Sequence, residues 1–132
     1  MSEQEQIYPP ATRHLAEQRQ RLAHKPADAF KAFTQSVFAD GALPAKTKQL
    51  IAVAVAHVTQ CPYCIQAHTK AAMRHGATPE EIMEAIWVAA EMRAGGAYAH
   101  SAIALETITR EQGDQPAQPW NQHDQFHTNL IL

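Results

Sequence analysis

The chain has 132 residues, which is enough for one domain and hardly more. Hydrophobic residues make up 45% of it and charged residues 18%, a balance that fits a globular protein and excludes a disordered one. Eleven basic and thirteen acidic residues give a net charge of -2, so we expect no nucleic-acid partner. The longest apolar run, Leu50 to Ala56, is far shorter than the roughly 20 residues of a membrane span. Because the N-terminus also lacks the features of a secretory signal, we expect a cytoplasmic protein with no membrane partner.

Helix signals dominate the first 60 residues. Prolines bracket a first helix near Thr12 to His24, and Asp28 can cap a second helix that ends at Asp40–Gly41. The second helix has one apolar face, which we expect to be buried; it carries Phe30, Phe33 and Val37. A third helix begins at Pro44. It is apolar nearly all round from Leu50 to Val58, so we expect it to be central and buried.

Three further helical segments follow. The fourth helix lies between Pro62 and Gly76, and a capping box at residues 78–81 opens the fifth. Gly95–Gly96 either break the fifth helix or allow another helix to pack closely, and a sixth helical stretch spans 97–110. The composition of 113–132 indicates an irregular tail. We therefore predict an all-α fold of about six helices in a single domain spanning 1–132.

The most informative segment is Cys61-Pro62-Tyr63-Cys64-Ile65-Gln66-Ala67-His68. Pro62 at the first helical position places Cys61 at the N-cap and Cys64 in the first turn. Cys64 and His68 are then four residues apart, on one face of the helix. The positive end of the helix dipole favours a thiolate there, and His68 can accept the Cys64 proton or pair with the thiolate. One short segment thus supplies a nucleophile, its base and a second thiol, the minimum for a dithiol redox cycle.

Two other interpretations of this segment are open. Buried free cysteines are common and usually inert. Zinc is a weaker alternative, because a structural site needs four ligands and Cys61, Cys64 and His68 supply three, with His57 a possible fourth. We predict neither a metal nor another cofactor.

The stretch from Lys46 to His100 resembles the core of the carboxymuconolactone decarboxylase-like family. Within that family it is most similar to the alkylhydroperoxidase AhpD-like branch. That branch has a glutamate, then Cys-x-x-Cys, then a histidine four residues later. The similarity covers about residues 30–110, and the following Gly-Ala-Thr-x-Glu-Glu helix start adds to it.

The resemblance implies an all-helical homo-oligomer, a trimer or a hexamer, that reduces hydroperoxides with its cysteine pair. A thiol reductant, either a protein or a small thiol, would then regenerate the pair. The resemblance assigns attack on the peroxide to Cys64, resolution to Cys61 and the role of base to His68. The dipole argument alone does not choose between the cysteines, because the cap position also favours Cys61.

The sequence departs from the family pattern at two positions. The family's glutamate falls on Gln49, whose amide can orient a water molecule or His68 but cannot accept a proton at neutral pH. Tyr63 stands where some members carry a histidine between the cysteines. Glu91, predicted to face inward on the fifth helix, is a candidate to replace the missing carboxylate. We expect His57, His100 and Trp87 to have structural roles.

The function predicted from the sequence is thiol-dependent reduction of hydroperoxides through the Cys61/Cys64 pair. An enzymatic alternative is decarboxylation of a carboxymuconolactone-type acid, which needs no dithiol. A non-enzymatic alternative is a redox sensor whose disulfide changes its assembly.

Overall fold

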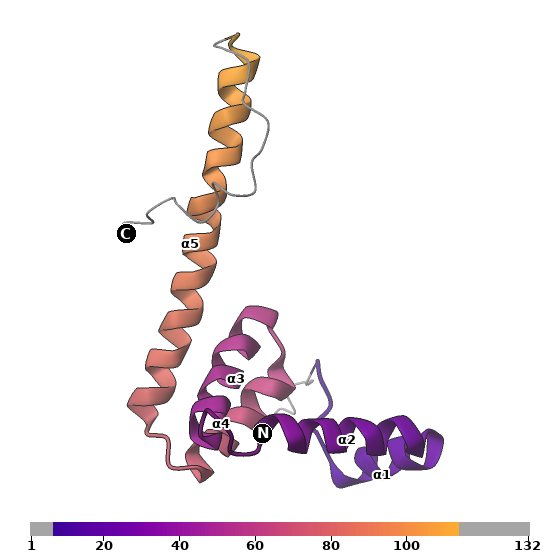
Figure 1. Ribbon diagram of the computed structural model, residues 1–132. Helices are drawn as coiled ribbons and strands as arrows, with labels where there is room; N and C mark the ends of the chain where they lie inside the picture. The colour runs from indigo at the N-terminus through magenta and orange to yellow at the C-terminus, as the bar shows by residue number, and fades with distance from the viewer. Residues whose placement is uncertain (1–6, 114–132) are drawn as a thin grey trace, which may run out of the picture. The chain divides into compact units, whose positions relative to one another are not determined.

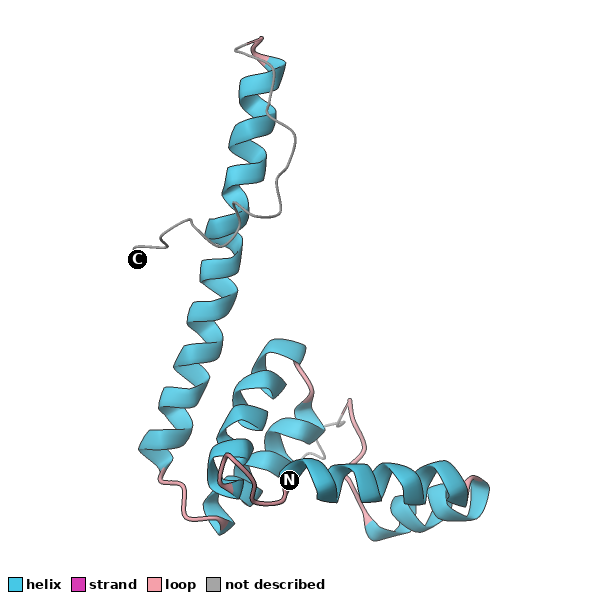
Figure 2. Cartoon of the chain, viewed as in Figure 1, coloured by secondary structure: helices cyan, strands magenta, loops and turns pink. Residues whose placement is uncertain are grey.

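A computed structural model describes residues 7–113, and this part of the chain is helical with no strand (Figures 1 and 2). The predicted all-α class is confirmed. None of the helices within 7–113 is both long and apolar enough to cross a membrane. The five helices are α1 (Arg13–Leu22), α2 (His24–Phe38), α3 (Ala45–Thr59), α4 (Pro62–Arg74) and α5 (Pro79–Glu111).

Local side-chain chemistry explains most helix ends. The Thr12 hydroxyl accepts the Leu15 amide and so caps α1. Gly76, with a φ of 90°, takes the left-handed conformation that follows α4. Thr78 and Glu81 form the predicted capping box: each backbone N–H donates to the side chain of the other residue, at 3.0 and 3.1 Å.

Two helices differ from the prediction. α2 begins at His24 because its first turn tolerates Pro26, and Asp28 accepts a hydrogen bond from Gln20 instead of capping the helix. α5 continues through Gly95–Gly96 as a single helix of 33 residues. A glycine lowers helix stability by about 1 kcal/mol relative to alanine, but it ends a helix only where it adopts a capping conformation. The positive-φ glycines of the described chain are Gly76 and Gly113, so the predicted fifth and sixth segments are one helix.

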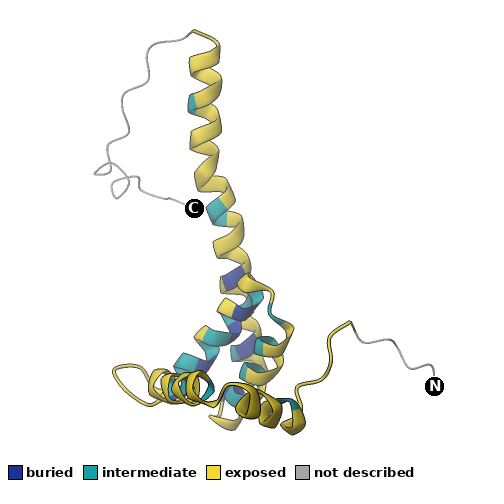
Figure 3. Cartoon of the chain, turned by 90° about the vertical axis from the view of Figure 1, so that its right-hand side faces the viewer, coloured by how far each residue is buried: buried dark blue, intermediate teal, exposed yellow. Residues whose placement is uncertain are grey.

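The chain divides into two units, Met1–Glu91 and Met92–Leu132. In the first unit α3 packs along α4, α2 contacts both α1 and α3, and the buried core lies between α3, α4 and the start of α5 (Figure 3). This core consists of Val53, Ala72, Ala77 and Ile82, with Leu50 and Ile86 packed against it. The core side chains within residues 7–113 are few and small, so this part of the chain buries little of its apolar surface.

Two predicted buried faces are largely exposed in the chain. On α2, Phe30 is 69% and Phe33 63% exposed. α3 is buried on one side, at Gln49, Val53 and Ala56, while Ile51 and Val55 are about half exposed. The prediction that these faces are buried is wrong for the described chain, because no element within residues 7–91 covers them.

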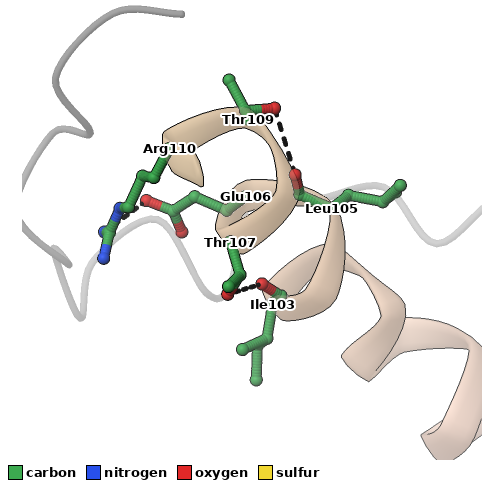
Figure 4. A network of polar contacts seen from close by, with 6 residues as sticks. All are labelled: Ile103, Leu105, Glu106, Thr107, Thr109 and Arg110. Atoms are coloured by element: carbon green, nitrogen blue, oxygen red, sulfur yellow. Dashed lines mark hydrogen bonds and ion pairs between the residues drawn. The ribbon is translucent and has the colours of Figure 1, made fainter. Parts of the chain in front are cut away.

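The described part of the second unit, residues 92–113, is the continuation of α5 and its end. Figure 4 shows a network of polar contacts near the end of this helix. Thr107 and Thr109 donate to the carbonyls of Ile103 and Leu105, and Arg110 pairs with Glu106 at 2.7 Å. Its apolar side chains are exposed, including Tyr98 and Leu105. The predicted irregular tail lies outside the described residues, apart from its first residue, Gly113.

Candidate functional site

The turn between α3 and α4 positions the two cysteines. Gln60 ends α3 in the left-handed conformation, with φ 57° and ψ 50°. The Cys61 amide then donates to the Ala56 carbonyl at 3.2 Å, a bond that spans the helix end. Cys61 is the N-cap of α4, and Pro62 follows at the first helical position, as predicted. Both cysteines are therefore held at the N-terminal end of a helix, where unpaired N–H groups favour negative charge.

The two thiols interact directly. Both cysteines are free and half-buried, and the Cys64 amide donates to the Cys61 sulfur at 3.3 Å. The hydrogen bond from the Cys64 thiol, together with that from its amide, lowers the pKa of Cys61. The same thiol hydrogen bond, with burial second, raises the pKa of Cys64. The two pKa values therefore move in opposite directions, and a base is needed to deprotonate Cys64.

His68 has a fixed partner in α3. Its Nδ1 lies 2.7 Å from Oε1 of Gln49, a side chain that is only 6% exposed. An amide oxygen can only accept, so Nδ1 carries the hydrogen and Nε2 is left with a free lone pair. The ring also stacks on Phe38, with centroids 5.0 Å apart. Burial lowers the pKa of His68, so the ring is a neutral base at neutral pH.

Cys64 and His68 line one pocket of about 380 Å³ in the first unit. Its other walls are mostly apolar and come from the end of α2 and one stripe of α3. They comprise Val37, Phe38, Lys48, Ile51, Ala52, Val55, Ala56 and Thr59. The predicted nucleophile and base are thus brought together beside an apolar cavity.

Known proteins share this arrangement of helices and much of the sequence. The carboxymuconolactone decarboxylase family matches residues 25–107. The chain belongs to the carboxymuconolactone decarboxylase family. These findings are consistent with membership of the alkylhydroperoxidase AhpD-like branch of the family.

The matches to individual proteins cover most of the length of each of those proteins. "Uncharacterized protein 4 in cox locus" of Paracoccus denitrificans is 67% identical over 86 residues, which are 65% of this chain and 78% of that protein. The crystal structure of a carboxymuconolactone decarboxylase family protein from Legionella pneumophila is 35% identical, with a TM-score of 0.57, and covers 77% of this chain and 88% of its own. A crystal structure of a protein from Methanobacterium thermoautotrophicum is 33% identical, with a TM-score of 0.60, and covers 64% and 94%.

The prediction that Glu91 faces inward is wrong. Its side chain is exposed, whereas Ala89 is 4% exposed. Two residues along a helix turn the side chain by about 200°, which places Glu91 on the opposite side from Ala89.

The other predicted residues have local partners. The ring nitrogens of His57 and His100 lie 2.7 Å from the carbonyls four residues earlier in their own helices, at Val53 and Gly96. The Tyr63 hydroxyl donates to the Pro9 carbonyl at 2.7 Å, and its ring meets that of Tyr8 edge to face. Within 7–113 no three His, Cys, Asp or Glu side chains are grouped to hold a metal ion.

Sequence reasoning missed two pocket residues, Phe38 and Lys48. A signal for Lys48 was present, because Lys48, Ile51, Ala52 and Val55 follow the spacing of one helix face. That face would have placed the lysine beside the pocket. Phe38, the last residue of α2, gave no such signal, since its contact with His68 joins residues 30 positions apart.

Proposed function

We propose that this protein reduces hydroperoxides with the Cys61/Cys64 pair and is regenerated by a thiol reductant. The observation that carries the proposal is that Cys64 and His68 line one mostly apolar pocket, while Cys61, which is not among the lining residues, accepts a hydrogen bond from the Cys64 amide. Membership of the carboxymuconolactone decarboxylase family supports it, together with the resemblance of Cys61, Cys64 and His68 to the pattern of the alkylhydroperoxidase AhpD-like branch.

In the first step His68 removes the Cys64 proton and the thiolate attacks the distal peroxide oxygen. The O–O bond breaks, the sulfur becomes a sulfenic acid, and the alkoxide leaves as an alcohol after taking the proton from His68. The raised pKa of Cys64 makes a base necessary, and the free Nε2 of a neutral His68 can provide it.

In the second step Cys61 resolves the sulfenic acid. The Cys61 thiolate, which accepts the Cys64 amide hydrogen bond at the N-terminus of α4, attacks the Cys64 sulfur, and hydroxide leaves as water once protonated. Two thiols of the reductant then reduce the disulfide and are oxidised to a disulfide themselves. The hydrogen bond between Cys61 and Cys64 means that the two sulfurs need little movement to react.

Stopped-flow oxidation of the reduced protein by several hydroperoxides tests the proposal. We expect wild type to lose two thiols per chain and to turn over when a dithiol is supplied. Cys61→Ser should stop after one equivalent at the sulfenic acid, whereas Cys64→Ser should not react rapidly. Equal slow oxidation of all three proteins would contradict the proposal. A disulfide that forms without turnover and changes the oligomer size would instead favour a redox sensor.

A further inference from the structure

Lys48 is a charged side chain in the pocket that the peroxide chemistry does not use. It lies in the first turn of α3 and is half-buried. Its ammonium group donates to the carbonyls of Val37 and Ala39 at 2.8 and 2.6 Å. An ammonium group has three N–H donors, so the two carbonyls hold it in place and one donor is free.

The charge of Lys48 has no acidic partner among residues 7–113. Lys46, two positions earlier, shows the contrast, because its ammonium pairs with Glu81 at 2.9 Å. Lys48 is bonded only to carbonyl oxygens in the described chain and lines the pocket. A fixed cation with a free donor at the edge of an apolar cavity favours a bound anion over a neutral group.

The pocket places this cation and the reactive cysteine at different positions along α3. The lining stripe runs from Lys48 to Thr59, which are eleven positions apart along the helix and separated by a rise of about 16 Å. His68 bonds Gln49, next to Lys48, whereas Cys61 bonds Ala56 further along the helix. Ile51, Ala52 and Val55 occupy the stripe between these two levels, so the wall between the cation and the cysteines is apolar.

We propose that Lys48 binds the carboxylate of an apolar acid whose hydroperoxide group reacts at Cys64. The reaction of the hydroperoxide at Cys64 rests on the proposed function, whereas the binding of the carboxylate at Lys48 rests on the pocket geometry. It defines the substrate class as hydroperoxides of hydrocarbon-rich acids, bound by an ion pair at Lys48 and by hydrophobic contact with α3. Lys48 is then a specificity-determining residue and takes no part in the bond changes.

A structural role is the competing explanation, since a cation that bonds the last carbonyls of α2 also stabilises that helix end. The two explanations differ in what Lys48→Met does. Loss of a helix contact affects all substrates equally. Loss of a carboxylate partner affects an acid and spares its neutral ester.

The test compares a fatty acid hydroperoxide with its methyl ester in wild type, Lys48→Met, Lys48→Arg and Lys70→Met. Lys70 is an exposed lysine of α4 outside the pocket lining and is the matched control. In Lys48→Met we expect KM for the acid to rise by about tenfold with kcat nearly unchanged, as for a lost charge-assisted hydrogen bond. KM for the ester should not change, Lys48→Arg should restore the preference, and Lys70→Met should behave as wild type. Equal changes for acid and ester would overturn the inference.

A second measurement needs no turnover. Calorimetric titration of the Cys61→Ser/Cys64→Ser protein with decanoate and with decanamide compares an anion with a neutral analogue. We expect decanoate to bind more tightly, and Lys48→Met to remove the difference. Equal binding of the two would overturn the inference even if peroxides are reduced. Lys48-dependent decanoate binding without any peroxide reduction would support the carboxylate site and contradict the proposed function.

Discussion

Replacing Gln49 by glutamate should change the ionisation of His68 more than any other single substitution in the site. The carboxylate would lie where Oε1 now lies 2.7 Å from Nδ1. Two unit charges 4 Å apart interact by about 4 kcal/mol at an effective dielectric constant of 20. Burial of position 49, which is 6% exposed, offsets part of this gain. We expect Gln49→Glu to raise the pKa of His68 by about 1–3, which corresponds to about 1.4–4 kcal/mol.

The raised pKa of His68 should also favour ionisation of the Cys64 thiol. A more basic His68 takes the Cys64 proton more readily and its cation stabilises the thiolate. In a Cys61→Ser background Cys64 is the only thiol of the chain, because the sequence has two cysteines. Alkylation of Cys64 should then show a lower apparent pKa with Gln49→Glu than with Gln49, and its reaction with peroxide should be faster.

Stability should respond to pH with opposite signs in the two proteins. Burial lowers the pKa of His68 in wild type, so the folded state binds fewer protons than the unfolded state, and stability falls as pH drops below about 6.5. In Gln49→Glu the raised pKa reverses the sign: the contribution is full below about 6.5 and is lost as pH rises through the new value. Urea unfolding at pH 5.5 and 8.5 measures both slopes.

Nuclear magnetic resonance titration of the histidine ring protons gives the direct measurement, with His68→Gln used to assign the signal among the eight histidines. Glu91→Gln is the matched control, because Glu91 is exposed and should leave the pKa of His68 and the alkylation profile unchanged. If Gln49→Glu folds and leaves the pKa of His68 where it was, the bond to position 49 does not control the base. The mechanism would then have to place another group against Nδ1.

Three further outcomes are expected. Mild oxidation should lower the subunit mass by about 2 Da as an intrachain disulfide forms; native cysteines that react with neither peroxide nor alkylating reagents would contradict the redox interpretation. Light scattering at micromolar concentration should show a trimer or hexamer, because exposed apolar residues of α2, among them Phe30 and Phe33, are expected to be buried between subunits; a monomer would refute this. Thr78→Ala should lower the free energy of unfolding by about 1 kcal/mol through loss of the capping hydroxyl, whereas an equal effect of the control Thr69→Ala, at a position that caps no helix, would argue against a specific cap.

The sequence was most informative where structure depends on neighbouring residues. The proline after Cys61, the glycine after α4 and the Thr78–Glu81 box each act within one turn, and each helix end formed as expected. The presence of Cys64 and His68 in the lining of one pocket agrees with the prediction that residues four apart share a helix face.

What the sequence could not give depends on contacts between distant residues. Gln49 was marked by the family pattern, but its bond to His68 joins positions 19 apart. The predicted orientation of Glu91 was wrong because the apolar pattern locates the edge of a buried helix face only to within one or two residues near the end of an apolar run. The faces of α2 and α3 were expected to be buried, yet apolar periodicity cannot tell burial within a chain from burial between chains.

The left-handed turn at Gln60 has a consequence for how oxidation can be observed. A non-glycine residue in this conformation costs about 1–2 kcal/mol, and here it ends α3 one residue before the first cysteine. The Cys61 amide donates across that turn to the Ala56 carbonyl of α3, and Cys61 is also the N-cap of α4. Its rate of hydrogen exchange is therefore a spectroscopic reporter on the backbone of the redox pair. Glycine has no steric cost in this conformation. The rate of disulfide formation in Gln60→Gly would therefore show how far the left-handed turn between α3 and α4 limits that reaction.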